Sequence, residues 1–317
     1  MLGEFILNHK KESAGVFIWR LLYPVLIFLG VEMAIEMIVM YAYMFHEISE
    51  GNITPEEINS SAEIVENFVQ RSSIYITIAR SAVLIPLYLY FMKRDNARDR
   101  IYGRYKEYSP YNRVWIIPVI LAGAAAALGF NHVVPFLMEA VQGGINAIAR
   151  SLFGKSGAVD FFSTYDNLSQ IIYSGGLFLQ VAATAVAAPV VEELLFRGLI
   201  FKRMRDSLKF VPAALLSSLI FGLVHANALQ FAYAFILGLL LAYVYEQFKT
   251  VWAPVLFHSG ANLISVIITA IAPDGIGLGI GGYMLLTVVE LAVTFLLLWV
   301  IRLKVNRIPV DKGGKNE

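Results

Sequence analysis

The chain has 317 residues, of which 58% are hydrophobic and only 15% are charged, and its formal net charge is +1. Soluble globular domains usually carry roughly 25% charged residues, so the composition argues against a soluble enzyme and excludes a disordered chain, a coiled coil or a collagen-like repeat. Cysteine is absent, which excludes disulfides, thiolate nucleophiles and thiolate metal sites. The small net charge provides no basic field that would favour nucleic acid as a partner. The composition therefore favours a bundle of membrane-spanning helices.

A helix that spans a bilayer needs about 20 mostly apolar residues, and eight segments of the chain meet this requirement. In chain order we expect spans at 15–45, 73–92, 113–138, 170–201, 211–227, 229–247, 250–271 and 280–302. The fourth of these is long and the fifth is short. The predicted fold class is an all-α polytopic membrane protein with about eight transmembrane helices in a bundle.

Charged residues in the connecting segments alternate in sign and predict the orientation of the spans. The segment 46–72 is rich in glutamate, whereas 93–113, 202–209 and the C-terminal tail are rich in lysine and arginine. An excess of lysine and arginine marks the cytoplasmic side, so we expect an integral, multi-pass protein with cytoplasmic N- and C-termini. The basic segment 93–113 also contains four tyrosines, and contact with anionic lipid headgroups is an alternative interpretation of it.

Several ionisable residues lie within the predicted spans, where they are costly and become candidates for function. The first span contains Glu32 and Glu36, one turn apart, and the second contains Arg80. We expect Arg80 to pair with these carboxylates and to fix the packing of the two helices. His132 in the third span and Glu290 in the last have no role that the sequence assigns.

The other polar residues within the spans fall into three short motifs in a fixed order. These motifs are Glu192-Glu193-x-x-x-Arg197, Phe221-x-x-x-His225 and His258-x-x-x-Asn262. On a helix, Glu193 and Arg197 are neighbours and can pair. Glu192 then lies about 100° around the helix, free to face a cavity.

The second and third motifs have the same four-residue spacing. It places His258 and Asn262 on one helix face, and it makes Phe221 a packing floor beside His225. The depths estimated for Glu192 and His258 are similar, whereas His225 comes out deeper in the membrane.

These residue types are sufficient to hydrolyse a peptide bond without a metal. A buried glutamate can act as general base on a water, and a histidine can share the proton and pass it to the leaving amine. A second histidine and an asparagine can donate hydrogen bonds to the developing oxyanion. Two alternatives remain open. Glu192, His225 and His258 could bind zinc, although the chain lacks an H-E-x-x-H motif, and a glutamate–histidine chain could carry protons or ions, although no inverted repeat is evident.

Taken together, the three motifs resemble those of the CAAX protease and bacteriocin-processing family of intramembrane endopeptidases, also called the Abi or CAAX prenyl endopeptidase-like family. The resemblance covers about 170–271 and leaves the first 110 residues outside. It implies a helical bundle around a polar catalytic cavity. Glu192 and His225 would activate water, and His258 and Asn262 would form the oxyanion site. The supporting residues would be Glu193, Arg197 and Phe221.

The resemblance also implies a partner and a location. The expected partner is a peptide or protein substrate at the membrane, of CAAX type or bacteriocin type, with the lipid bilayer as the surroundings and no cofactor; zinc is the alternative. The 33-residue spacing from His225 to His258 suggests a prokaryotic member in the plasma membrane. The competing interpretation is a non-proteolytic membrane protein, an immunity factor or a carrier, that retains the motifs.

We predict three parts of the chain. Residues 1–110 form an N-terminal two-helix membrane segment with a basic cytoplasmic loop. Residues 111–305 form the protease-like core, with the motifs within 170–271. Residues 306–317 form a cytoplasmic tail.

Overall fold

The computed structural model describes residues 13–52, 54, 62–101, 113–153, 176–225, 227–272, 277 and 280–305. The predicted tail 306–317, most of the basic loop (102–112) and the first residues of the fourth predicted span (170–175) lie outside the described residues. Every regular element among the described residues is helical. The protein is therefore an all-α polytopic membrane protein, as the composition predicts.

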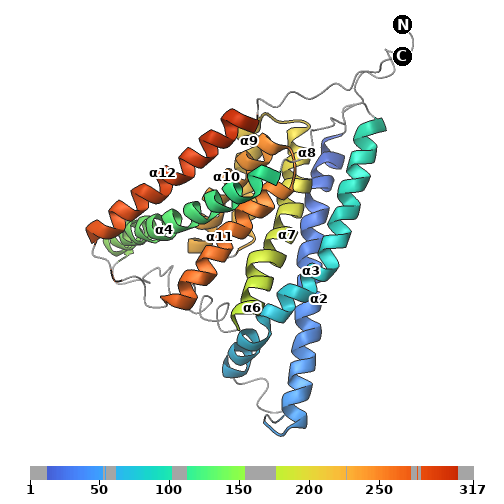
Figure 1. Ribbon diagram of the computed structural model, residues 1–317. Helices are drawn as coiled ribbons and strands as arrows, with labels where there is room; N and C mark the ends of the chain where they lie inside the picture. The colour runs from blue at the N-terminus through green and yellow to red at the C-terminus, as the bar shows by residue number, and fades with distance from the viewer. Residues whose placement is uncertain are drawn as a thin grey trace.

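Thirteen helical elements follow one another along the described chain (Figure 1). They are α2 (Ala14–Ser49), α3 (Ala62–Ile101), η2 (Arg113–Trp115), α4 (Ile116–Phe153), α6 (Leu177–Gln180), η3 (Val181–Ala187), α7 (Ala188–Glu193), η4 (Leu194–Phe201), α8 (Lys202–Arg205), α9 (Phe210–Leu223), α10 (Ala228–Phe248), α11 (Trp252–Ile271) and α12 (Ile280–Val305). The elements from α6 to α8 follow one another without a break and form one long helix.

Seven of the described helices are long and apolar enough to cross a membrane. The fifth predicted span corresponds to α9, which has 14 residues and is therefore about 21 Å long, short of the ~30 Å hydrocarbon core. The prediction of eight spans is thus approximate. Three predicted boundaries also differ from the helices: α3 begins at Ala62 and not at 73, it includes 93–101 of the predicted basic loop, and α4 continues beyond 138 to Phe153.

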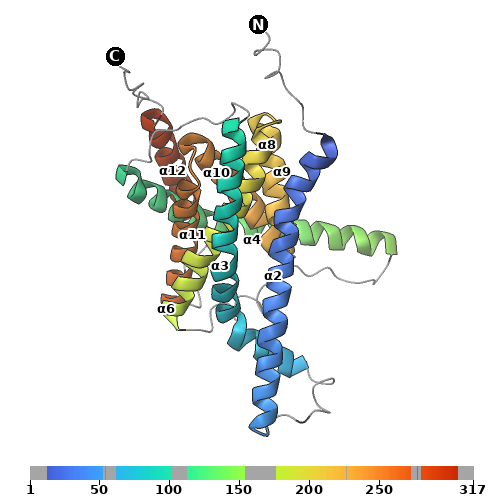
Figure 2. The same cartoon turned by 90° about the vertical axis from the view of Figure 1, so that its right-hand side faces the viewer.

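The beginning of α2 and the end of α12 lie at the same end of the bundle, as Figure 2 shows. This placement agrees with two termini on one side of a membrane. The assignment of that side as cytoplasmic stays a prediction.

The helix from α6 to α8 lies at the centre of the arrangement. On one side, α3 contacts η3, α7 and η4 and separates them from most of α2, which packs along α3. On the other side, α11 contacts η3 and α7, and α4 crosses α11 and α12 (Figure 1). Side chains of the central helix are therefore enclosed by both halves of the molecule.

Two glycines allow the backbones of α4 and α11 to touch where they cross. A Cβ atom at Gly123 would overlap the carbonyl oxygen of Phe257, and one at Gly260 would overlap that of Ile120. Small residues allow such close approach of helices in membranes. The crossing therefore fixes where His258 lies relative to α4, because His258 follows Phe257 directly in the sequence.

A buried arginine ties α2 to the central helix. Pro24 lacks an N–H group, so the carbonyl of Arg20, four residues earlier, has no helical donor. The Nη1 of Arg203 donates to this carbonyl, and its Nε donates to Asp95 Oδ2 on α3 at 2.6 Å. Arg203 is almost completely buried, so this contact locks the N-terminal pair of helices onto the rest of the bundle.

Candidate active site

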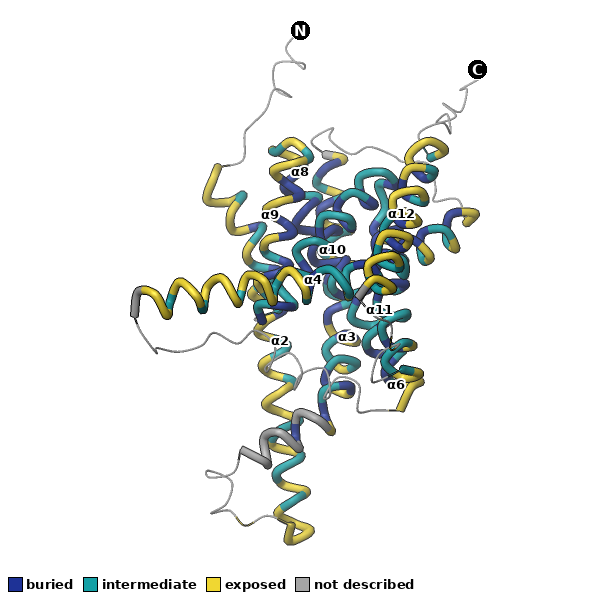
Figure 3. The backbone as a smooth tube through the Cα atoms, turned by 90° about the vertical axis from the view of Figure 1, so that its left-hand side faces the viewer, coloured by how far each residue is buried: buried dark blue, intermediate teal, exposed yellow. Residues whose placement is uncertain are grey.

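The two glutamates of the first motif lie at the end of α7, between two π-helical segments of the central helix, and Arg197 lies in the second of these segments, η4. Pro189 at the start of α7 cannot donate to the backbone, which interrupts the regular hydrogen bonding after η3. The residues of η4 that follow Glu193 are all buried, and Figure 3 shows buried chain in this central part of the bundle. π-helical turns occur frequently at functional sites.

Glu193 and Arg197 form the buried ion pair that their spacing predicts. The Nη1 of Arg197 donates to Glu193 Oε1 at 3.0 Å, and both side chains are fully buried. The Nη2 of Arg197 donates to the carbonyl of Gly238 on α10, also at 3.0 Å. The pair therefore connects the central helix to α10, which fits a supporting role.

His258 on α11 lies between the two glutamates. Its Nδ1 is 2.9 Å from Glu193 Oε1, so this carboxylate is shared by Arg197 and His258. Its Nε2 is 3.8 Å from Glu192 Oε2, too far for a direct hydrogen bond and a separation that one water can bridge. The Glu192 side chain is 17% exposed and that of Glu193 is 0% exposed, so only Glu192 is open to an approaching molecule.

Phe221 on α9 lies against three members of the site, as its predicted role of packing floor requires. The guanidinium of Arg197 lies 4.6 Å from the Phe221 ring centroid. The rings of His225 and His258 meet the Phe221 ring edge to face, with centroids 5.0 Å and 5.9 Å away. Phe221 is therefore the shared surface on which both histidines rest.

His225 lies just beyond the last residue of α9 and not within a span, contrary to the prediction. Its Nδ1 is 2.8 Å from the carbonyl oxygen of Phe221. Because a carbonyl oxygen only accepts, Nδ1 must carry the proton in this hydrogen bond. The Nε2 of a neutral His225 is then available to accept a proton.

Asn262 lies one turn after His258 on α11, and its amide is bound to the central helix. The Nδ2 group donates to the carbonyl of Thr184 in η3 at 2.8 Å. A side-chain amide has two N–H donors, so this contact uses one and orients the other. Thr184 was not predicted, because its contribution is a backbone carbonyl and carries no signal in the sequence.

The structure thus gathers most of the predicted residues in one place. Glu192, Glu193, Arg197 and His258 are within direct contact or a single water of one another. His225 joins this group through the Phe221 ring. Asn262 faces η3 on the side of α11 that carries His258.

The zinc alternative does not fit the arrangement of these side chains. Among the described residues, no group of three or more His, Asp or Glu side chains is placed so that it could hold a metal ion. Glu192, His225 and His258 therefore do not form a ligand set in this conformation. Absence of a cofactor stays a prediction.

Two other polar contacts lie outside this site. Arg80 pairs with Glu32, which confirms the predicted contact between α2 and α3. On α4 and α12, His132 Nδ1 lies 3.2 Å from Glu290 Oε2, so Glu290, for which the sequence indicated no partner, has one.

The comparisons with known proteins point to the same part of the chain. Residues 174–264 match the sequence model of a family described as "Type II CAAX prenyl endopeptidase Rce1-like". Over 89 residues the chain is 33% identical to a Bacillus subtilis (strain 168) protein named "Putative membrane peptidase YdiL", a stretch that covers 28% of this chain and 36% of that protein. The chain thus matches about a third of the length of this relative. No solved structure matches the chain significantly.

Proposed function

Because residues 174–264 match the type II CAAX prenyl endopeptidase Rce1-like family, we propose that the protein is an intramembrane endopeptidase of the glutamate type. The observation that carries the proposal is the placement of Glu192. Its carboxylate is the accessible member of a buried cluster and lies 3.8 Å from His258 Nε2. One water can hydrogen-bond to both the Glu192 carboxylate and the His258 Nε2. A water in hydrogen-bond reach of a carboxylate is the arrangement that general base catalysis needs.

In the proposed first step, Glu192 removes a proton from this water as its oxygen attacks the carbonyl carbon of the scissile bond. The new C–O bond converts the carbonyl oxygen into an oxyanion. The remaining N–H of Asn262 donates a hydrogen bond to this oxygen, and His258 donates a second one from Nε2 when both of its ring nitrogens carry a proton, since Nδ1–H is already used on Glu193; such donors in a dry site lower the barrier by several kcal/mol. The Glu193 carboxylate holds His258 in place through Nδ1.

In the proposed second step, the C–N bond breaks and the leaving nitrogen takes up the proton that came from water. Glu192 and His225 carry this proton between them, since the Nε2 of His225 is free to accept while Nδ1 donates to the Phe221 carbonyl. The products are a carboxylate and an amine, so water supplies all the atoms that are added. No metal takes part in either step.

The proposed substrate is a membrane-associated peptide or protein, of CAAX type or bacteriocin type. The central helix and α11, which carry the site, are spanning helices. A substrate must therefore reach Glu192 from the bilayer or from its surface. We further propose that the protein lies in a prokaryotic plasma membrane with both termini in the cytoplasm.

The test begins by identifying a substrate from the membrane peptides that accumulate when Glu192→Gln replaces the wild-type protein in cells. Cleavage of that peptide is then measured with purified protein in nanodiscs. We expect Glu192→Gln to lower the cleavage rate about 10²–10⁴-fold, the usual contribution of a general base. Glu139→Gln is the matched control, because Glu139 is an exposed glutamate of α4, and it should cleave at the wild-type rate. Wild-type cleavage by Glu192→Gln would contradict the proposal.

A further inference from the structure

A cavity lies between α2 and α3, outside the segment that matches the family. It has a volume of about 610 Å³, and its lining includes Glu32, Glu36, Met40, Met44, Phe68 and Thr77. Pockets that bind small molecules usually measure about 300–1,000 Å³ and combine an apolar lining with a few polar groups. The size and composition of this cavity therefore fit a small amphiphilic ligand.

The two carboxylates of the cavity differ in their partners. Glu32 is paired with Arg80, and the Arg80 guanidinium lies over the Phe28 ring, 5.0 Å from its centroid. Phe28, Glu32 and Glu36 follow one another at four-residue steps on α2, and the direct contacts of Arg80 are with Phe28 and Glu32. Within the described part of the chain, no hydrogen bond or ion pair engages Glu36. Arg80 attracts Glu36 only at longer range, so Glu36 is left without an ion-pair partner of its own among the described residues.

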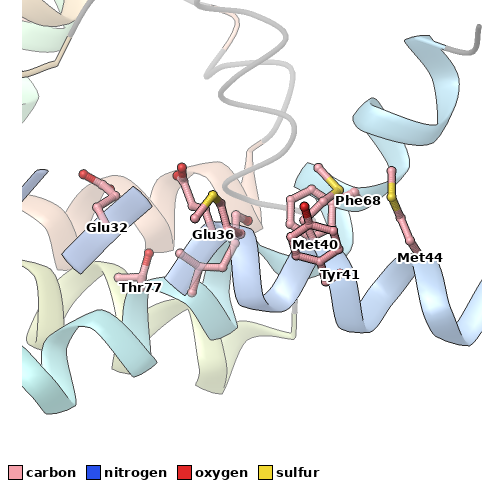
Figure 4. Close-up of a pocket in the computed structure, with 10 residues that line it drawn as sticks. Glu32, Glu36, Met40, Tyr41, Met44, Phe68 and Thr77 are labelled. Carbon is pink, nitrogen blue, oxygen red and sulfur yellow. The ribbon is translucent and has the colours of Figure 1, made fainter. Parts of the chain in front are cut away.

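The polar and apolar groups of the cavity are arranged in order along α2. Figure 4 shows Glu36 between Glu32 and Met40, with Met44 further along the same helix. Phe68 lies beside Met40 on the α3 wall (Figure 4). From Glu36 to Met44 the helix rises about 12 Å. Methionine side chains adapt to irregular apolar ligands because they are unbranched and polarisable.

We propose that this cavity binds an apolar molecule with a single protonated amine, whose ammonium group pairs with Glu36 and whose chain lies along Met40, Met44 and Phe68. Charge complementarity selects the head group, since Arg80 forms its ion pair with Glu32 and leaves Glu36 without one. A free carboxylate within an apolar helix is costly, and a bound ammonium relieves that cost. Thr77 and Ser73 supply hydroxyls on the α3 wall, and the Ser73 Oγ is buried with no hydrogen-bond partner among the described residues.

The test measures equilibrium binding of radiolabelled dodecylamine to the full chain in phosphatidylcholine nanodiscs, whose quaternary head groups cannot donate a hydrogen bond. We expect saturable binding, with dodecanol and dodecanoate binding at least about tenfold more weakly because they lack the cation. Glu36→Gln should weaken dodecylamine binding by about tenfold or more. Glu139→Gln, which removes a carboxylate elsewhere on the protein, should leave the binding unchanged.

A second variant tests the site by adding a cation to the protein and keeping the carboxylate. Met40→Lys places an ammonium one turn from Glu36, where it can pair with that carboxylate, so dodecylamine affinity should fall as it does in Glu36→Gln. The unfolding midpoint of each variant is compared with that of the wild type to show that the fold is kept. Equal affinity of wild type and both variants, equal affinity for the three probes, or no saturable binding would overturn the inference. The readout is binding alone, so the outcome does not depend on whether the protein cleaves peptides.

Discussion

Two places in this protein combine two glutamates with one arginine, and their surroundings make them different. In the central helix, Glu193 and Arg197 are both 0% exposed, and Glu193 also holds His258. Between α2 and α3, the pair of Glu32 and Arg80 is only partly buried, with 27% of the Glu32 side chain exposed. In each place the arginine balances one carboxylate and leaves a second one free to act.

The comparison shows that the neighbours of the free carboxylate decide its chemistry. Glu192 faces a histidine across a gap that a water can fill, which suits proton transfer. Glu36 is followed along its helix by methionines, which suits retention of an apolar cation. The same residue types thus support a proposed reaction in one place and a proposed binding site in the other.

The largest expected effect is a loss of folding stability, and it should differ between the two arginines because they differ in burial. Arg197→Met leaves Glu193 as a buried charge without its main partner, and breaking a buried pair in this way costs about 3–5 kcal/mol. Arg80→Met also leaves a carboxylate without its partner in an apolar helix, but 27% of the Glu32 side chain is exposed, so the loss should be smaller than for Arg197→Met. Unfolding of both variants in denaturant measures the difference. Similar losses for the two would show that burial does not distinguish these pairs.

A smaller effect is expected at the crossing of α4 and α11. Gly260→Ala forces the Cβ atom against the Ile120 carbonyl, and overpacking of this kind costs about 1–3 kcal/mol. The displaced α11 also carries His258 and Asn262, so cleavage should fall by about tenfold or more. Gly30→Ala on α2 is the control, because no atom lies within 4 Å of its Cβ position; stability and cleavage should stay near wild type. An unchanged cleavage rate in Gly260→Ala would show that the crossing does not position the site.

The sequence predicts the motifs well because four-residue spacing on a helix has a direct geometric meaning. The pair of Glu193 and Arg197 and the pair of Glu32 and Arg80 were both expected and both form. His225 was misplaced in a span because apolar composition continues past the end of α9, whereas the helix ends at Leu223. Hydropathy records how apolar a segment is and not where its hydrogen bonding stops.

Contacts made through the backbone could not be predicted from the sequence. The carbonyls of Thr184, Gly238 and Arg20 each accept from a functional or buried side chain. Any residue type supplies a carbonyl, so no spacing identifies these acceptors. The π-helical turns around α7 likewise depend on how the chain packs, although Pro189 marks the place where one becomes possible.

The central claim is that Glu192 and His225 carry the proton of one water between them, and a double-mutant cycle tests it most directly. Single-turnover cleavage is measured for Glu192→Gln, for His225→Ala and for the combination, in nanodiscs with one substrate. Residues that act as a unit are strongly non-additive. We therefore predict that the double variant is no slower than the slower single variant. Rate losses that multiply would show that the two residues act independently and would contradict the account.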